Sequence, residues 1–189
     1  LGSMYVFRGV TLILSGGQAI WGFPDNFVYI GTGYFLGIPV PVIIMALIYL
    51  AGHIVLTRFK YGRYVQAIGG DEEAARRCGV NIKLTKMFTY GLCGALASFS
   101  GVILAGRLGS GQPGVGTGYE LIAIAATVIG GTSLLGGIGT VAGTLVGTII
   151  LGMLSNALNL LGVAPFFQTV ITGSMVIIAV LADTIKLRR

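Results

Sequence analysis

Charged side chains are scarce in this sequence, since Asp, Glu, Lys and Arg together make up 10% of its 189 residues. A soluble domain usually carries about 25%, so much of the apolar surface must face something other than water. Histidine occurs only as His53, with no cysteine or carboxylate at metal-ligand spacing, and Cys78 and Cys93 form no CxxC pair. These scarcities argue against a disulfide framework, a metal site and an enzyme with convergent catalytic groups.

A phosphate-binding loop of the form GxxxxGK[ST] is also lacking. Any ATP must therefore be bound and hydrolysed by a partner subunit, and no cofactor is expected on this chain. The spacing Gly109-x-Gly111-x-x-Gly114 matches a dinucleotide fingerprint, but that motif needs a preceding strand and a following helix. Here it follows an apolar run and contains Pro113, which indicates an external turn.

Apolar residues are abundant and gather in six segments, which we predict to be helices because open strands leave backbone groups unsatisfied in lipid. The segments are 1–15, 38–57, 87–106, 119–131, 139–161 and 166–182. The first is too short to span a bilayer alone, so we expect an N-terminal part to be missing from this chain. The fourth is either a crossing or a half-helix or re-entrant piece. The prediction is an all-α, polytopic integral membrane bundle with five to six segments, forming one domain over 1–189.

Basic residues dominate the net charge of +6 and lie beside apolar runs. Ten of the twelve occur in residues 58–86 and in the C-terminal tail, namely Arg58, Lys60, Arg63, Arg76, Arg77, Lys83, Lys86, Lys186, Arg188 and Arg189. The positive-inside rule places both stretches in the cytoplasm, and the four segments between them satisfy the required parity if 119–131 crosses. Anionic lipid headgroups account for such clusters. Without a basic groove interleaved with aromatics, no nucleic-acid partner is expected.

Two further patterns concern the membrane. Residues 16–37 are rich in aromatics and predict an external loop at headgroup level, with a direct substrate role as the alternative. Gly139, Gly143 and Gly147 recur every four residues, so we expect them on one helix face where a second helix packs closely.

Residues 71–79 have the pattern of a short capped helix within the polar stretch 58–86. Asp71 suits the N-cap and Gly79 the left-handed position after the helix. Glu72 and Glu73 precede Arg76 and Arg77, which complements the helix dipole. A solvated helical loop and a docking surface for another subunit both fit these residues.

Several blocks of sequence carry a family resemblance. They are GRYVQAIGGDEEAARRCGV (62–80), GSGQP (109–113), GTGYEL (116–121), VIGGTSL (128–134), GG (136–137) and LNLLGV (158–163). Together they resemble the permeases of bacterial monosaccharide (ribose, xylose, galactose type) ABC transporters. Branched-chain amino-acid permeases are a related group, but the Gly-Thr-Ser and Asn-Leu-Leu-Gly blocks favour sugars.

This resemblance implies a multi-pass inner-membrane protein that moves a monosaccharide by alternating access. Implied partners are an ABC ATPase subunit, a periplasmic sugar-binding protein and a second permease copy. The implied ATPase-docking (coupling) helix comprises Gly70, Asp71, Glu72, Glu73, Ala74, Ala75, Arg76, Arg77 and Gly79.

Polar residues near the expected path are candidates for contacting a neutral polyol, because amides and hydroxyls donate and accept without fixed charge. They are Gln112, Tyr119, Glu120, Asn156, Asn159 and Gln168. Hydrogen bonding between helices is the alternative for each, and Thr117-x-x-Glu120 favours a capping box for Glu120.

Other functions stay open. The chain could belong to a permease for an autoinducer or a branched-chain amino acid. A secondary transporter or channel working without ATP would need intramembrane charge pairs or proton relays, and the apolar segments are nearly free of charge.

Overall fold

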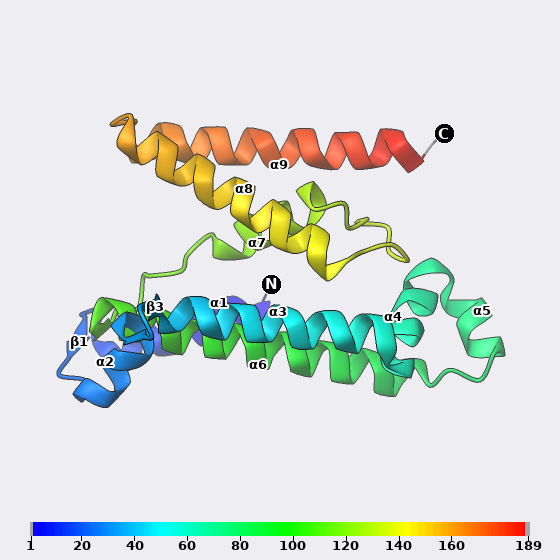
Figure 1. Cartoon of the computed structure of the whole chain (residues 1–189), viewed down its shortest axis with the longest axis horizontal. Coiled ribbons are helices and arrows are strands. Elements are labelled where there is room, and N and C mark those ends of the chain that lie inside the picture. Colours follow the sequence, from blue (N-terminus) through cyan, green and yellow to red (C-terminus); the bar gives the residue numbers. More distant parts are fainter. Residues whose placement is uncertain (1, 188–189) are drawn as a thin grey trace. The chain divides into compact units, whose positions relative to one another are not determined.

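The protein is predominantly helical, with four two-residue strands in the part of the chain that the structure describes (Figure 1). The computed structural model describes residues 2–187, without the side chains of 165, 176, 178, 179 and 182–187. The chain forms two compact units: the part up to Leu47 with Tyr90–Thr117, and Ile48–Thr89 with the part from Gly118 onward. Helices α3 (Val40–Arg58) and α6 (Ile82–Leu108) each contribute residues to both units.

The first unit combines helices with short strand pairs. Its other elements are α1 (Gly2–Ser15), β1 (Ile20–Trp21), α2 (Asp25–Thr32), β2 (Tyr34–Phe35), β3 (Ile38–Pro39) and β4 (Ser110–Gly111). Strands β1 and β4 pair antiparallel, and β2 and β3 form a two-residue hairpin whose turn, Leu36-Gly37, has positive φ at both residues. Gly31 of α2 lies against the backbone of Arg107 at the end of α6, where a β carbon would overlap it.

The second unit contains the remaining helices. They are α4 (Lys60–Gly70), α5 (Glu72–Arg77), α7 (Tyr119–Ile129), α8 (Val141–Leu160) and α9 (Pro165–Leu187). Helix α7 packs against α8 and α9, and the small core there consists of Ala125, Ala126 and Leu151, flanked by Ile129 and Met175. Tyr49 of α3 and Thr148 of α8 share a hydrogen bond of 3.2 Å between their hydroxyls.

Three helices in the described part of the chain, α3, α6 and α8, are long and apolar enough to cross a membrane. Their apolar side chains are mostly exposed; no residue of the most apolar window of α3 or α6 is buried within the protein. Helix α7 has 11 residues, about 16 Å at 1.5 Å per residue, roughly half of the ~30 Å hydrocarbon core. Exposure on this scale suits helices that lipid surrounds.

Four sequence expectations need correction or extension. Residues 16–37 are not a plain loop but contain α2 and strands. Residues 60–70 form helix α4, which the sequence pattern did not predict. The capping box at Thr117 is wrong: Gly118, with φ of +87°, is the N-cap of α7 and offers no side chain, while the Thr117 hydroxyl donates to the Gly114 carbonyl. Gly139 does not share a helix face with Gly143 and Gly147, because α8 begins only at Val141, after the N-cap Thr140.

Candidate docking segment and solute path

Helix α5 is held by its own local interactions. The Asp71 carboxylate accepts hydrogen bonds from the amides of Glu73 (2.8 Å) and Ala74 (3.0 Å), so it caps the helix as the sequence predicts. At the other end, Gly79 takes the positive φ of 82° that favours glycine. Arg77 pairs with Glu73 at 2.6 Å one turn earlier. These features make a stable six-residue helix at a position where the chain could otherwise be a loop.

The surface of α5 is open. Ala75 is its one buried residue, at 4% exposure, while the other five residues of the helix are exposed. Helix α4, which precedes it directly, is amphipathic: Tyr61, Val65 and Ile68 are partly buried, and Lys60 and Arg63 are exposed. The segment therefore has one face packed on the protein and one face available to a partner.

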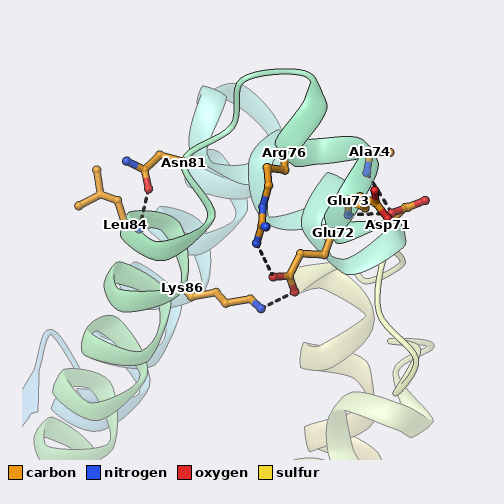
Figure 2. A network of polar contacts seen from close by, with 8 residues as sticks. All are labelled: Asp71, Glu72, Glu73, Ala74, Arg76, Asn81, Leu84 and Lys86. Atoms are coloured by element: carbon orange, nitrogen blue, oxygen red, sulfur yellow. Dashed lines mark hydrogen bonds and ion pairs between the residues drawn. The ribbon is translucent and has the colours of Figure 1, made fainter.

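A contact that the sequence did not predict joins α5 to the first turns of α6. Lys86 Nζ donates to Glu72 Oε2 at 2.5 Å, and Figure 2 shows both Lys86 and Arg76 directed toward the Glu72 carboxylate. Asn81 caps α6 by accepting the Leu84 amide at 3.1 Å. Glu72 and Lys86 are 14 residues apart, so neither helical periodicity nor a known motif indicates the pair.

A second long-range contact lies at the end of α4. Gly69 is in backbone contact with Gly136 and Gly137, and a β carbon at Gly69 would lie 2.5 Å from the Gly137 nitrogen. This contact puts the connection between α7 and α8 on the side of the second unit where α4 lies. A cavity of about 350 Å³ adjoins it, lined by residues that include Gln66, Thr132 and Thr144.

The close packing expected of glycines occurs between α7 and α8. A β carbon at Gly143 would overlap the Gly130 carbonyl, and one at Gly147 would overlap the Ala126 carbonyl. Gly139 instead lies against the side chain of Thr132, in the connection that precedes α8. Helix α7 is thus in direct backbone contact with α8, although its 11 residues are too few to cross the membrane as a helix.

The candidate path residues are distributed over both units. In the first unit, Gln112 lines a cavity of about 390 Å³ together with Thr11, Ser15 and Ser110, and its amide donates to the Ser110 hydroxyl at 3.2 Å. Ser110 is almost fully buried, at 1% exposure. Most of the lining is apolar, including Leu14, Leu104 and Leu108, and the few hydroxyl and amide groups are the part of it that suits an uncharged polar solute.

In the second unit, Tyr119 and Glu120 are exposed on the first turn of α7, and Asn156 is exposed on α8. Asn159 and Gln168 lie together at the turn between α8 and α9, where Gln168 Nε2 donates to Asn159 Oδ1 (2.9 Å) and to the Val163 carbonyl (2.8 Å). These bonds close the α8–α9 turn. A role for any of these five residues in binding solute stays a prediction.

Comparisons with known proteins agree on the class. A family profile described as "branched-chain amino acid transport system / permease component" matches residues 1–180. The ribose import permease proteins of Escherichia coli (strain K12) and Bacillus subtilis (strain 168) are 47% and 48% identical to this chain, covering 97% and 98% of it. The L-arabinose transport system permease protein of E. coli is 40% identical over 98% of the chain. The chain spans 58%, 58% and 57% of these three relatives. No solved structure matches.

Proposed function

The chain belongs to the family of branched-chain amino acid transport system permease components, and on this basis we propose that it is part of the membrane-spanning permease of an ATP-driven monosaccharide importer. The observation that carries the proposal is the identity of 40–48% with relatives named as ribose and L-arabinose permeases, over nearly the whole chain. The family consists of transport permeases and not of enzymes.

The orientation follows from charge. With α4 and α5 in the cytoplasm, the basic stretch 58–86 obeys the positive-inside rule. The connection between α7 and α8 then also lies at the cytoplasmic face, because Gly136 and Gly137 contact Gly69 of α4. Helix α6 runs outward, and the half-helix α7 with the extended chain before it runs back. This arrangement keeps the C-terminal basic residues in the cytoplasm of a bacterial cell, beneath the inner membrane.

Helix α5 is the proposed docking site for an ABC ATPase subunit. Its caps and intrahelical ion pairs hold it rigid, and five of its six residues are exposed. A rigid, exposed helix loses little conformational entropy when a partner binds. ATP is bound by that partner, and its cycle would drive alternating access of the solute path.

Two other partners complete the proposal. A periplasmic sugar-binding protein would deliver its ligand to the outer side, which 16–37 and 107–118 form in the first unit. A second permease copy would build a central path between two chains, as the resemblance to monosaccharide permeases implies. An uncharged amide such as that of Gln112 suits a sugar better than an ion.

Docking can be tested by a bulky substitution on the exposed face of α5. Ala74→Trp leaves the Asp71 cap and both Glu–Arg pairs in place, so the helix should persist while the partner surface is blocked. We expect the co-expressed ATPase subunit of the same transporter to stop co-purifying with this variant and to co-purify normally with the matched control Ala74→Ser. Full retention by Ala74→Trp would contradict the proposed site.

The substrate class needs a separate test because the family description names branched-chain amino acids. Proteoliposomes containing the complete transporter should accumulate labelled ribose or another monosaccharide when ATP is supplied, and unlabelled leucine should not compete. Accumulation of leucine, or of sugar without ATP, would instead support an amino-acid permease or a secondary transporter.

A further inference from the structure

The connection between α5 and α6 is short and hydrogen-bonded to both helices. It consists of the four residues 78–81. The amides of Cys78, Gly79 and Val80 donate to the carbonyls of Ala74, Arg76 and Ala75, each at 3.0–3.1 Å, which attaches these three to α5. Asn81 belongs to the other helix, because its side chain and its carbonyl accept the amides of Leu84 and Thr85. Each of the four residues of the connection is therefore hydrogen-bonded to one of the two helices.

Helices α4 and α5 contact the first two turns of α6 through a few side chains. Ile82 and Thr85 are buried there, at 6% and 8% exposure. The hydroxyls of Tyr61 in α4 and Thr89 in α6 share a hydrogen bond of 2.7 Å, and the Tyr61 ring meets Phe88 edge-on with centroids 5.1 Å apart. Beyond Thr89, the next thirteen residues of α6 are all exposed. The part of α6 that α4 and α5 contact is thus confined to residues 82–89.

In the described part of the chain, Glu72 makes the one ion pair between α5 and residues 82–89 of α6. Its Oε2 accepts from Lys86 at 2.5 Å, whereas Arg76, one turn along the same helix, stays 3.9 Å from its Oε1 (Figure 2). The carboxylate is therefore bonded more closely to α6 than to its own helix. Its helical neighbour Glu73 has the opposite arrangement, since it pairs within α5 with Arg77.

We infer that Glu72 and Lys86 form the contact through which a displacement of α5 is passed to the membrane helix α6. Helices α4 and α5 and residues 82–89 of α6 then move as one rigid body. The ion pair prevents α5 from rotating about the connection 78–81. This inference rests on the proposed function, because it assigns a role in coupling to residues of the proposed docking segment. Lys86 is a positioning residue here and touches neither solute nor nucleotide.

The pair is suited to a clean test because it contributes little to folding. The two side chains are 47% and 46% exposed, and exposed ion pairs contribute little to the free energy of unfolding. Lys86→Gln should therefore leave the thermal unfolding midpoint nearly unchanged. Lys83 supplies a matched control, since it is an exposed cation three residues earlier on α6 and has no carboxylate within 4.0 Å in the described chain.

The experiment measures sugar accumulated per ATP hydrolysed, in proteoliposomes with the complete transporter. We expect Lys86→Gln to lower this ratio about threefold, a change within the range that an exposed ion pair supplies, while the ATPase still co-purifies. Lys86→Arg should restore the ratio, and Lys83→Gln should not change it.

Three results would overturn the inference: an unchanged ratio in Lys86→Gln, an equal loss in Lys83→Gln, or failure of Lys86→Gln to retain the ATPase. The last would mean that Lys86 belongs to the docking surface. Failure of the unaltered permease to retain any ATPase would instead overturn the proposed function, and the two failures are distinguished by which protein shows them.

Discussion

The backbone of Gly147 in α8 lies against the carbonyl oxygen of Ala126 in α7, with no room between them for a β carbon. Gly143 makes the same kind of approach to Gly130 one turn earlier. Small residues let membrane helices pack through their backbones, where dispersion contacts replace the hydrophobic driving force that lipid does not supply. The short helix α7 is held in place largely by this contact.

Gly147→Ala should destabilise the protein because its new methyl group must displace α7. Overpacking of this kind costs about 1–3 kcal/mol, which should lower the thermal unfolding midpoint in detergent. Gly152→Ala is the matched control on the same helix, since a β carbon there meets nothing within 4 Å. Equal midpoints for the two variants would show that α7 and α8 are not in backbone contact.

Gly69→Ala should displace the connection between α7 and α8 from α4. Its methyl group would lie 2.5 Å from the Gly137 nitrogen, whereas Gly70→Ala, one residue later, places its methyl group in open space. We expect amides in 130–140 to exchange with deuterium faster in Gly69→Ala and at the normal rate in Gly70→Ala. Unchanged exchange in both would refute the contact.

Asp71→Ala should fray the start of α5. The substitution removes the acceptor of the Glu73 and Ala74 amides, and loss of an N-cap typically costs about 1 kcal/mol. Faster deuterium exchange at these two amides and weaker capture of the ATPase are expected. Asp71→Asn should keep both near normal, because asparagine caps about as well; the prediction fails if the two variants behave alike.

The cations of 58–86 fall into two groups, and they should differ in lipid binding. Arg76, Arg77 and Lys86 have carboxylates within 4.0 Å, whereas Arg58, Lys60, Arg63 and Lys83 have none in the described chain. Arg58 ends the apolar helix α3 and Lys60 and Arg63 follow it, at a place where anionic headgroups attract basic residues. The triple variant Arg58→Gln/Lys60→Gln/Arg63→Gln should retain fewer phosphatidylglycerol molecules in native mass spectrometry.

The control for that prediction is Arg76→Gln/Arg77→Gln/Lys86→Gln, which removes the same charge from partnered positions and should retain phosphatidylglycerol normally. An equal loss in both triple variants would show that net charge alone, and not the unpartnered cations, governs lipid retention.

Local sequence signals predicted the structure where neighbours along the chain supply the interaction. The six apolar runs located α1, α3, α6, α7, α8 and α9 to within five residues at each end, but no run marked α2 or α4. Asp71 and Gly79 marked the ends of α5 because caps depend on residues at most four positions apart. The same local reasoning failed at Thr117, where the left-handed Gly118 moved the helix start beyond the reach of the threonine side chain.

The sequence by itself determined that the chain is a helical membrane protein, because a composition with 10% charge and long apolar runs leaves few stable alternatives in water. It also determined the capped helix α5 and, through its motifs, the transport family. Only the tertiary structure decided that Glu72 binds Lys86, that Tyr61 meets Thr89 and that Gly69 contacts Gly137. Those pairs join separate elements, and no periodicity or capping rule operates over such separations, so the packing of whole helices selects them.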